Sequence, residues 1–470
     1  MKNRKQGIVL LPVVMVFLFG CTSQNSLNNE GNDSMAMFTG IGMKVDGKNI
    51  DLYSVRANNT RSWTTNAQNI CDQVAVGMFD MEGTVQIEIT LSNSPSNVVV
   101  RPLSRGINPM VNGEKITFSI SEPSQYSVEY GNSLKETILI FANPAEEFTG
   151  TTVLEAGIYT GNYTVDSGQT LYLKPGAVIR GSVKMASNSK LVGRGIIDGS
   201  IYDNWVRNGY RAVLPIETYN ADNIEINGIT IFDPSGWNIQ LRDTSNVTIS
   251  NIKIVASRCN SDGISIQSSD NITIKDSFIR TWDDGVVIKN YGDRDSYAIT
   301  VKNCRMWTDL AQSLEIGFET NKGKKDNPKI YDVTFEDIEI FHALHKAPIS
   351  IHNGDNAEIY NVTYKNITIE NYQAGNGDGW NYLIDIANLT GDASGGAREW
   401  TSVRERGNIH NILIDNVKIS GKPPSARFDS RQGGSIYDVT VRNIYRDADK
   451  LNFSSNVGVY ASANATVNFD

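Results

Sequence analysis

The feature that most constrains the fold of this 470-residue chain is a six-residue pattern that recurs through its second half. The pattern is Asn or Asp, an aliphatic residue, any residue, an aliphatic or aromatic residue, any residue, and again Asn or Asp. With two slightly degenerate copies included, it begins at residues 223, 246, 271, 298, 332, 361, 411 and 438. Successive starts lie 23, 25, 27, 34, 29, 50 and 27 residues apart. A steady minimum spacing with variable insertions is typical of a solenoid.

Each copy of the pattern alternates apolar and polar residues, as a strand with one buried face does. We therefore expect each repeat to form one coil of a right-handed parallel β-helix, with about three short strands per coil stacked roughly 4.8 Å apart. Inward aliphatic residues would fill the core, and Asn and Asp would satisfy backbone groups at the corners, often as ladders. Leucine-rich repeats have a similar period, but they need a helix-like segment and a leucine lattice that this sequence lacks.

The region before the repeat predicts a smaller, separate β domain. Short alternating segments such as Val85–Thr90 and Lys115–Ile120 are separated by turn signals, which favours a β-sandwich. The predicted fold class is thus all-β, with a β-sandwich over residues 37–147 and the parallel β-helix over residues 148–470. The largest repeat spacing predicts a long loop over residues 371–408, beside the groove along the β-helix.

The N-terminus has the pattern of an export signal. A basic start is followed by the apolar run Ile8–Phe19, which is short for a bilayer-spanning helix and ends at Gly20-Cys21. This resembles a bacterial lipobox, so we expect residues 1–20 to be a lipoprotein signal peptide and Cys21 to carry lipid. Residues 21–36 would form a flexible tether. The protein would then be a cell-envelope lipoprotein on the outer membrane, in the periplasm or facing the surface. An ordinary secretory signal is the alternative.

Charge and cysteine content restrict the partners. The net charge is −9 and there is no basic run, which disfavours nucleic acid. No second apolar segment approaches membrane length, so the lipid would be the only membrane anchor. Cys71, Cys259 and Cys304 have neither the count nor the spacing of a disulfide framework or a zinc site, and buried thiols are the simplest interpretation. We expect a monomer.

Three of the four histidines, His342, His345 and His352, lie within eleven residues of sequence. A metal site would need acidic partners, and none is spaced clearly beside them. The sequence therefore predicts no metal and no cofactor. Substrate or surface roles remain for these histidines.

Three aspartates occur on two consecutive repeats, in Asn260-Ser261-Asp262-Gly263 and in Trp282-Asp283-Asp284-Gly285. When the strands that follow are aligned, Asp262, Asp284 and Gln312 share one column, and Asp283 precedes the column by one residue. One Asp-Gly is more often a turn than a catalytic site. Two in register, one of them doubled, favour catalysis because packing three carboxylates together costs stability.

Paired carboxylates can hydrolyse a glycoside by direct displacement. One carboxylic acid protonates the leaving oxygen, and one carboxylate deprotonates the attacking water at a separation of roughly 6.5–9.5 Å. Packing like charges together keeps one group protonated near neutral pH, which supplies the acid. The cluster therefore predicts an inverting glycoside hydrolase that acts on a polysaccharide or oligosaccharide without a cofactor.

The repeat and the aspartates resemble the clan that holds glycoside hydrolase families 28 (polygalacturonases) and 49 (dextranase and isopullulanase), which have a pectinase-like β-helix. Family 28 shows Asn-Thr-Asp-Gly, then Asp-Asp, then Gly-His-Gly and Arg-Ile-Lys. In this chain Asn260-Ser261-Asp262-Gly263 precedes Asp283-Asp284, with Asp262 and Asp283 21 residues apart. By this resemblance Asp283 is the general acid, and Asp262 and Asp284 position and deprotonate the water.

Two departures from family 28 distinguish this chain. Ala311-Gln312-Ser313 replaces Gly-His-Gly, and the region of Arg-Ile-Lys reads Ala347-Pro-Ile-Ser-Ile-His352. The missing Arg and Lys meet galacturonate carboxylates in the family. The layout resembles family 49 more closely, because that family has a β-sandwich before the β-helix and three aspartates without Gly-His-Gly. The resemblance implies a neutral α-linked glucan or a related plant or microbial polysaccharide.

Six further side chains are candidates for substrate binding because they lie beside the aspartates or on neighbouring strands. They are Asn260, Trp282, Lys289, Gln312, Glu319 and His352. A solvated face is the alternative for Lys289 and Glu319.

Three rival functions remain open from the sequence. A pectinase variant of the same clan would take its uronate contacts from Lys289, Lys346 or Arg404. A polysaccharide lyase shares the fold but usually needs a basic catalytic residue, which the aspartate column lacks. A non-catalytic carbohydrate-binding β-helix would keep its affinity for sugar after substitution of the aspartates.

Overall fold

The computed structural model describes residues 34–57, 72–202, 213–321, 326–373, 375, 382–389, 406–453 and 458–470. The expected signal peptide, Cys21 and most of the expected tether lie outside these residues, so the lipid anchor stays a prediction. No helix in the described part of the chain is long and apolar enough to cross a membrane. Nearly all regular structure is β, and Leu103–Arg105 is a short 3-10 helix.

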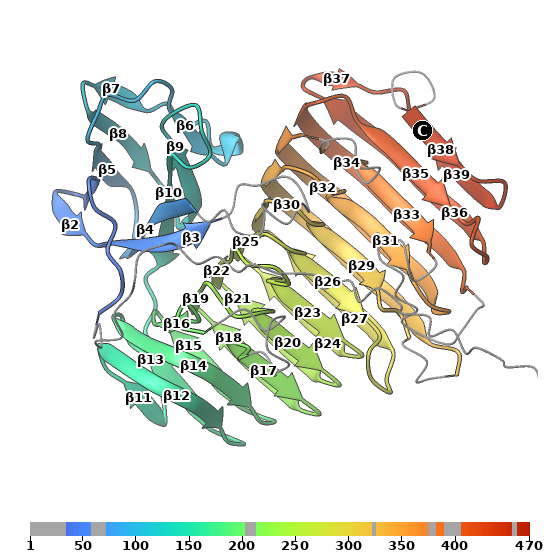
Figure 1. The fold of residues 1–470 in the computed structure, drawn as a ribbon, viewed down its shortest axis with the longest axis horizontal. Helices are drawn as coiled ribbons and strands as arrows, with labels where there is room; N and C mark the ends of the chain where they lie inside the picture. Colours follow the sequence, from blue (N-terminus) through green and yellow to red (C-terminus); the bar gives the residue numbers. More distant parts are fainter. Residues whose placement is uncertain are drawn as a thin grey trace, which may run out of the picture.

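The N-terminal domain is a β-sandwich of two five-stranded sheets (Figure 1). The first contains β2 (Lys48–Ile50), β1 (Gly42–Val45), β5 (Val85–Thr90), β8 (Lys115–Ile120) and β7 (Met110–Asn112). The second contains β3 (Leu52–Ala57), β4 (Asp72–Met81), β10 (Thr137–Pro144), β9 (Ser124–Glu129) and β6 (Val99–Arg101). Alternating buried residues of both sheets form one apolar core.

The remaining strands form one parallel β-helix, in which each strand pairs with its equivalents on the coils before and after it. The first stack contains β11 (Thr152–Leu154), β13 (Thr170–Leu173), β15 (Lys190–Gly193), β18 (Asp222–Asn227), β21 (Ser245–Ser250), β24 (Asp270–Lys275), β27 (Ser296–Lys302), β30 (Lys329–Ala343), β32 (Glu358–Tyr372), β34 (Ile409–Gly421), β36 (Ile436–Arg446) and β39 (Ala465–Phe469).

The second stack contains the strands that follow Asp262, Asp283 and Asp284. It contains β12 (Gly157–Val165), β14 (Ala177–Met185), β17 (Ile216–Tyr219), β20 (Ile239–Arg242), β23 (Ile264–Gln267), β26 (Val286–Lys289), β29 (Leu314–Phe318), β31 (Ile349–Asn353), β33 (Ile384–Asn388), β35 (Ser425–Asp429) and β38 (Gly458–Ala461). The third contains β16 (Ile196–Asp198), β19 (Thr230–Phe232), β22 (Lys253–Val255), β25 (Phe278–Thr281) and β28 (Arg305–Thr308), and continues in the second half of β30. A short β37 (Asp449–Lys450) pairs antiparallel with β36.

The predicted fold class is confirmed, and the repeat explains it. The aliphatic positions of the pattern are fully buried in one continuous core, as at Ile249, Ile274 and Val301. The flanking Asn and Asp adopt positive φ, with Asn246 at 57° and Asn361 at 55°, a conformation that these residues tolerate better than others. Side chains of successive corners also bond to one another, as predicted for ladders: Asn361 Nδ2 donates to Asp332 Oδ1 at 2.9 Å.

Two expectations need correction. The stretch 371–408 is not one long loop, because residues 384–388 within it form β33, which pairs with β31 and β35. Leu383, Ile384 and Ile386 are fully buried there, so this stretch contributes its own layer to the core. Among the thiols, Cys304 is buried but Cys259 is only half-buried, since it lies at a corner rather than in a strand. Cys71 lies outside the described residues.

The sandwich packs against the third stack, as Figure 1 shows for β3, β4 and β10 beside β16 to β25. Phe141 of β10 meets Phe278 of β25 with ring centroids 5.2 Å apart. Several charges in this interface form opposite pairs, whereas the ammonium of Lys253 donates to uncharged oxygens, including Asn143 Oδ1 at 2.6 Å. Arg101 contacts both Glu129 and Glu370 at 2.8 Å, and within the third stack Arg280 contacts Asp309 at 3.2 Å with neither side chain exposed.

Candidate active site

The register of the second stack brings the aspartates together. Ile264 pairs with Val286 and Val286 with Leu314, so the residues two positions earlier, Asp262, Asp284 and Gln312, form the predicted column. Backbone hydrogen bonds continue this register, because Gly263 N–H donates to Asp284 O at 2.8 Å. The strands β23, β26 and β29 thus fix the column through their backbone, whatever the side chains do.

Asp283 is held apart from the column by backbone donors. Its Oδ2 accepts the Asn260 N–H at 3.0 Å, and its Oδ1 accepts the Asp284 N–H at 3.0 Å. Thr281 Oγ1 donates to the Asp283 carbonyl at 2.6 Å and closes the corner. Asn260 therefore contacts Asp283 through its backbone N–H. A sequence motif does not reveal whether a residue acts through its backbone or its side chain.

Lys289 is the cation of the site. Its Nζ lies 3.5 Å from Asp262 Oδ2 and 3.2 Å from Glu319 Oε2, and its side chain is 7% exposed. A solvated face, the alternative for Lys289 and Glu319, is therefore wrong. Burial lowers the pKa of Lys289, but Glu319, Asp262 and Asp284 outweigh it and hold the pKa above its usual range.

The three carboxyl groups cannot all ionise easily in this setting. Burial, and then the charge of Asp262, raises the pKa of Asp283 to about 7. Burial raises the pKa of Asp284 well above its usual range, and Asp283, Asp262 and Glu315 add to the rise. Burial also raises the pKa of Asp262, but there Lys289 opposes the rise. The cluster consequently shares protons near neutral pH, with negative charge favoured beside Lys289.

The other predicted binding residues divide into two groups. Gln312, 4% exposed, donates its backbone N–H to Asp284 Oδ1 at 3.2 Å, so it lies in the cluster. Trp282 and His352 have no exposed surface, because both side chains face packed neighbours. Neither side chain is therefore accessible to a substrate.

His352 does have acidic partners, which corrects the sequence-based expectation. Its Nδ1 lies 2.9 Å from Glu315 Oε1 and its Nε2 lies 3.2 Å from Asp385 Oδ2. Arg427 closes the row with contacts of 2.7 and 2.8 Å to the two oxygens of Asp385. Although burial lowers the pKa of His352, Glu315 and Asp385 raise it to about 9. No group of acidic, histidine or cysteine residues in the described ranges could hold a metal ion.

Sequence reasoning also missed Trp237 as a site residue. Lys289 Nζ lies 4.9 Å from the centre of its ring, and the Trp237 side chain is half-buried. The signal was available, because Trp237 aligns with Asp262 in the repeat. Of the rival uronate contacts, Lys346 is buried and Arg404 lies outside the described residues.

Known glycosidases are similar to this chain in sequence and in fold. Residues 147–377 match the sequence model of glycosyl hydrolases family 28. Isopullulanase from Aspergillus niger is 22% identical over 442 residues, which cover 79% of this chain and 73% of that protein. An exopolygalacturonase from Arabidopsis thaliana is 34% identical over 137 residues, 29% of each chain.

Two solved structures share the fold. Dex49A from Penicillium minioluteum aligns with a TM-score of 0.63 at 16% identity, over 94% of this chain and 97% of its own. A hyperthermoactive exopolygalacturonase from Thermotoga maritima aligns with a TM-score of 0.52 at 17% identity, over 68% of this chain and 83% of its own. Only the first of these two alignments is long enough to include most of both domains. The chain is therefore a glycosidase that is similar in sequence to glycosyl hydrolases family 28 and to isopullulanase, and it shares its fold with Dex49A.

Proposed function

We propose that this glycosidase hydrolyses a polysaccharide with inversion, with Asp283 as the general acid and Asp262 and Asp284 holding and deprotonating the attacking water. The observation that carries the proposal is the division of the cluster. Asp283 is oriented separately by two backbone donors, while Asp262 and Asp284 share a column and Lys289 lies against Asp262. Two environments for neighbouring carboxyl groups are what acid and base roles require.

The roles follow from the charges. Asp283, with a pKa raised to about 7 by burial and by Asp262, keeps a proton to give to the leaving oxygen. Asp262 keeps its negative charge most readily because of the ammonium at 3.5 Å, so it accepts the proton of the water. The water oxygen bonds to the anomeric carbon, the glycosidic bond to the leaving oxygen breaks, and the new hydroxyl lies on the opposite face of the sugar.

A neutral glycan, such as an α-linked glucan, is the substrate class that fits the charges best. Besides the three aspartates, Glu315 helps to raise the pKa of Asp284 and Glu319 contacts Lys289, and the cations Lys289 and His352 are engaged by carboxylates. A uronate carboxylate would meet this surplus of negative charge and would have to displace an existing ion pair. The relationship to isopullulanase points the same way.

The test is hydrolysis of a panel of neutral and uronic polysaccharides, with the anomeric configuration of the first product followed by NMR. We expect inversion, activity on a neutral glycan, and a decline of kcat/KM as pH rises above 7 and Asp283 loses its proton. Asp283→Asn should lower kcat/KM by about 10²- to 10⁴-fold with binding retained.

Asp332→Asn is the matched control, since the same change at an exposed corner should leave activity unaltered. A product of retained configuration would refute the mechanism. An unsaturated product that absorbs ultraviolet light would identify a lyase. Binding of a glycan without hydrolysis of any member of the panel would favour the non-catalytic alternative.

A further inference from the structure

A row of side chains leads away from the aspartates along the second stack. Tyr219, Arg242, Gln267 and Lys289 pair with one another on successive strands, from β17 to β26. One end of the row is Lys289, in contact with Asp262. The other end is Tyr219, whose side chain is 67% exposed. The row therefore connects the candidate active site to an aromatic ring in solvent.

Both ends of this row combine an aromatic ring with a cation. The Arg242 guanidinium lies 5.2 Å from the centre of the Tyr219 ring, and the Lys289 ammonium lies 4.9 Å from the centre of the Trp237 ring. Aromatic rings offer apolar faces to the C–H face of a sugar, and neighbouring cations donate to its hydroxyls. Two such sites in line suit successive residues of one glycan chain.

Two donors within the row are not satisfied by the described part of the chain. Arg242 Nε and Gln267 Nε2 are buried there without a hydrogen-bond partner, although Gln267 Oε1 accepts from Gln240 at 3.1 Å. The carboxylate of Asp243 lies 3.5 Å from Arg242 Nε, at the limit of contact. Gln267 has no exposed surface, but the Arg242 side chain is 33% exposed, so the outer part of its guanidinium can donate to sugar hydroxyls.

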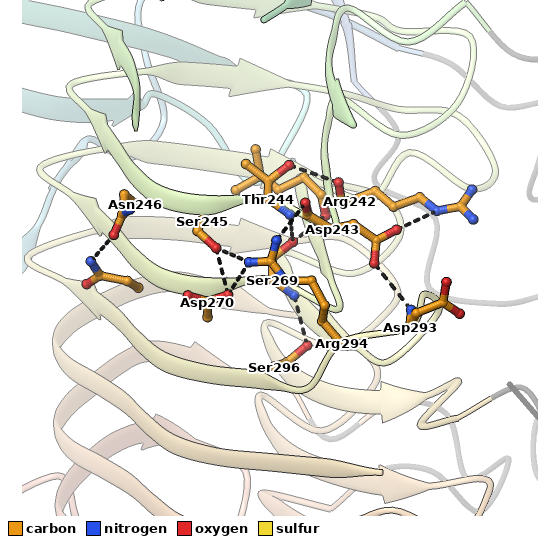
Figure 2. A network of polar contacts seen from close by, with 12 residues as sticks. Arg242, Asp243, Thr244, Ser245, Asn246, Ser269, Asp270, Asp293, Arg294 and Ser296 are labelled. Carbon is orange, nitrogen blue, oxygen red and sulfur yellow. Dashed lines mark hydrogen bonds and ion pairs between the residues drawn. The ribbon is translucent and has the colours of Figure 1, made fainter. Parts of the chain in front are cut away.

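The segment that follows Lys289 bonds to Asp243, the residue next to Arg242 in the row (Figure 2). Asp293 N–H donates to Asp243 Oδ1 at 3.3 Å, and Arg294 donates to the Asp243 carbonyl at 3.1 Å. Arg294 also contacts Ser245 and Asp270. Figure 2 shows Arg242 at the edge of this network, where a dashed line joins its guanidinium to the Asp243 carboxylate. These bonds of Asp293 and Arg294 join three successive coils, which keeps the backbone beside Arg242 in a fixed conformation.

We propose that Trp237, Arg242 and Tyr219 form a saccharide-binding extension of the active site, so that the substrate is a glycan chain rather than a disaccharide. This inference rests on the proposed hydrolase function. Tyr219 and Lys289 are separated by three strand spacings, roughly 14 Å along the axis, which exceeds the length of one sugar ring. Several sugar residues on this side of the cleaved bond would contact the row.

The test compares kcat/KM across a series of oligosaccharides, from the disaccharide upward, prepared from whichever polysaccharide the wild-type protein hydrolyses. We expect the wild-type value to rise with chain length. Tyr219→Ala should lower kcat/KM roughly tenfold on the longest members and leave the shortest unchanged. Arg242→Gln should show the same dependence on length. Tyr331→Ala, the same change on the first stack, is the control and should show none.

The outcomes separate this inference from the proposed function. A wild-type protein that hydrolyses the panel, with Tyr219→Ala and Arg242→Gln either unaffected or equally impaired at every chain length, would overturn the extension and leave the mechanism standing. If the wild-type protein hydrolyses nothing, binding decides. Retardation in a gel containing the polysaccharide should then weaken in Tyr219→Ala and Arg242→Gln, and unchanged mobility in both would overturn the extension. Melting temperatures confirm that each variant is folded.

Discussion

Two buried histidines ten residues apart, on two sides of the β-helix, have pKa values shifted in opposite directions. His342 Nε2 contacts Glu129 at 2.7 Å, and His352 Nδ1 contacts Glu315 at 2.9 Å. Burial lowers the pKa of His342 to about 4, because Arg101 and Arg280 oppose the help of Glu129. The pKa of His352 rises to about 9 despite burial, because Glu315 is joined by a second anion, Asp385. The sign of the further neighbours decides the outcome.

The same contrast extends to the surfaces that carry these histidines. At the sandwich interface, several charges form opposite pairs, such as Arg305 with Glu339 at 3.0 Å. On the second stack, three aspartates gather around one lysine. In a buried pair, the loss of either partner leaves the other charge uncompensated and destabilises the fold. A surplus of acid costs stability and yields the raised pKa values that catalysis uses.

The largest effect on stability is expected from the interface. Asp309→Asn would deprive Arg280 of its buried counter-charge and weaken the 2.9 Å bond from Trp307 Nε1 to Asp309 Oδ1. We expect it to lower the free energy of unfolding by about 3–5 kcal/mol. Asp283→Asn, the same change on the second stack, should alter it by less than about 1 kcal/mol, because it also relieves repulsion by Asp262. Urea denaturation of both variants measures the two values, and equal losses would contradict the contrast.

The two histidines should give opposite dependences of stability on pH. A raised pKa stabilises the fold below the unfolded value of about 6.5, and this contribution, about 3 kcal/mol, is lost as pH rises through 9. The deficit of His352→Gln should therefore shrink between pH 6 and 10. A lowered pKa costs stability as pH falls from 6.5 toward 4, so the deficit of His342→Gln should shrink in that range instead. Denaturation midpoints across pH check both, and parallel curves would rule out the assignment.

The smallest effect is expected at the coil corners, which belong to neither surface and so give a baseline. Asn361 has a φ of 55° and bonds to Asp332. Asn361→Ala should be about 1 kcal/mol less stable than Asn361→Gly, because alanine is strained at positive φ while both changes remove the same two hydrogen bonds, to Asp332 and from Asn411. Thermal melting of the two variants measures the difference. Equal melting temperatures would show that the ladder rather than the backbone conformation matters at this corner.

Local repetition explains how much could be predicted. The coils, the corner residues and the column of Asp262, Asp284 and Gln312 follow from a pattern that repeats within each coil, and backbone pairing enforces them. Contacts across insertions could not be predicted in this way. Glu315 meets His352 from 37 residues away, with a long strand of another stack between them.

Side-chain direction was the second limit. The motif around Asp283 could not reveal that Trp282 has no exposed surface, or that Asn260 contacts Asp283 through its backbone N–H. A strand hidden in the widest repeat spacing, β33, supplies Asp385 to the row beside His352. The alternation of a short strand within a stretch rich in Gly and Asp was too brief to identify it.

Rows that take one residue from each successive coil also affect how the sequence of such a protein can change in evolution. A duplicated coil placed before β17 would lengthen the helix by one strand spacing and leave the coils of Asp262 and Asp284 adjacent. The same duplication between β23 and β26 would separate those two carboxyl groups and abolish their shared column. Evolution can therefore change the number of coils beside the site without changing the aspartate cluster, as long as the two coils of the aspartates remain neighbours.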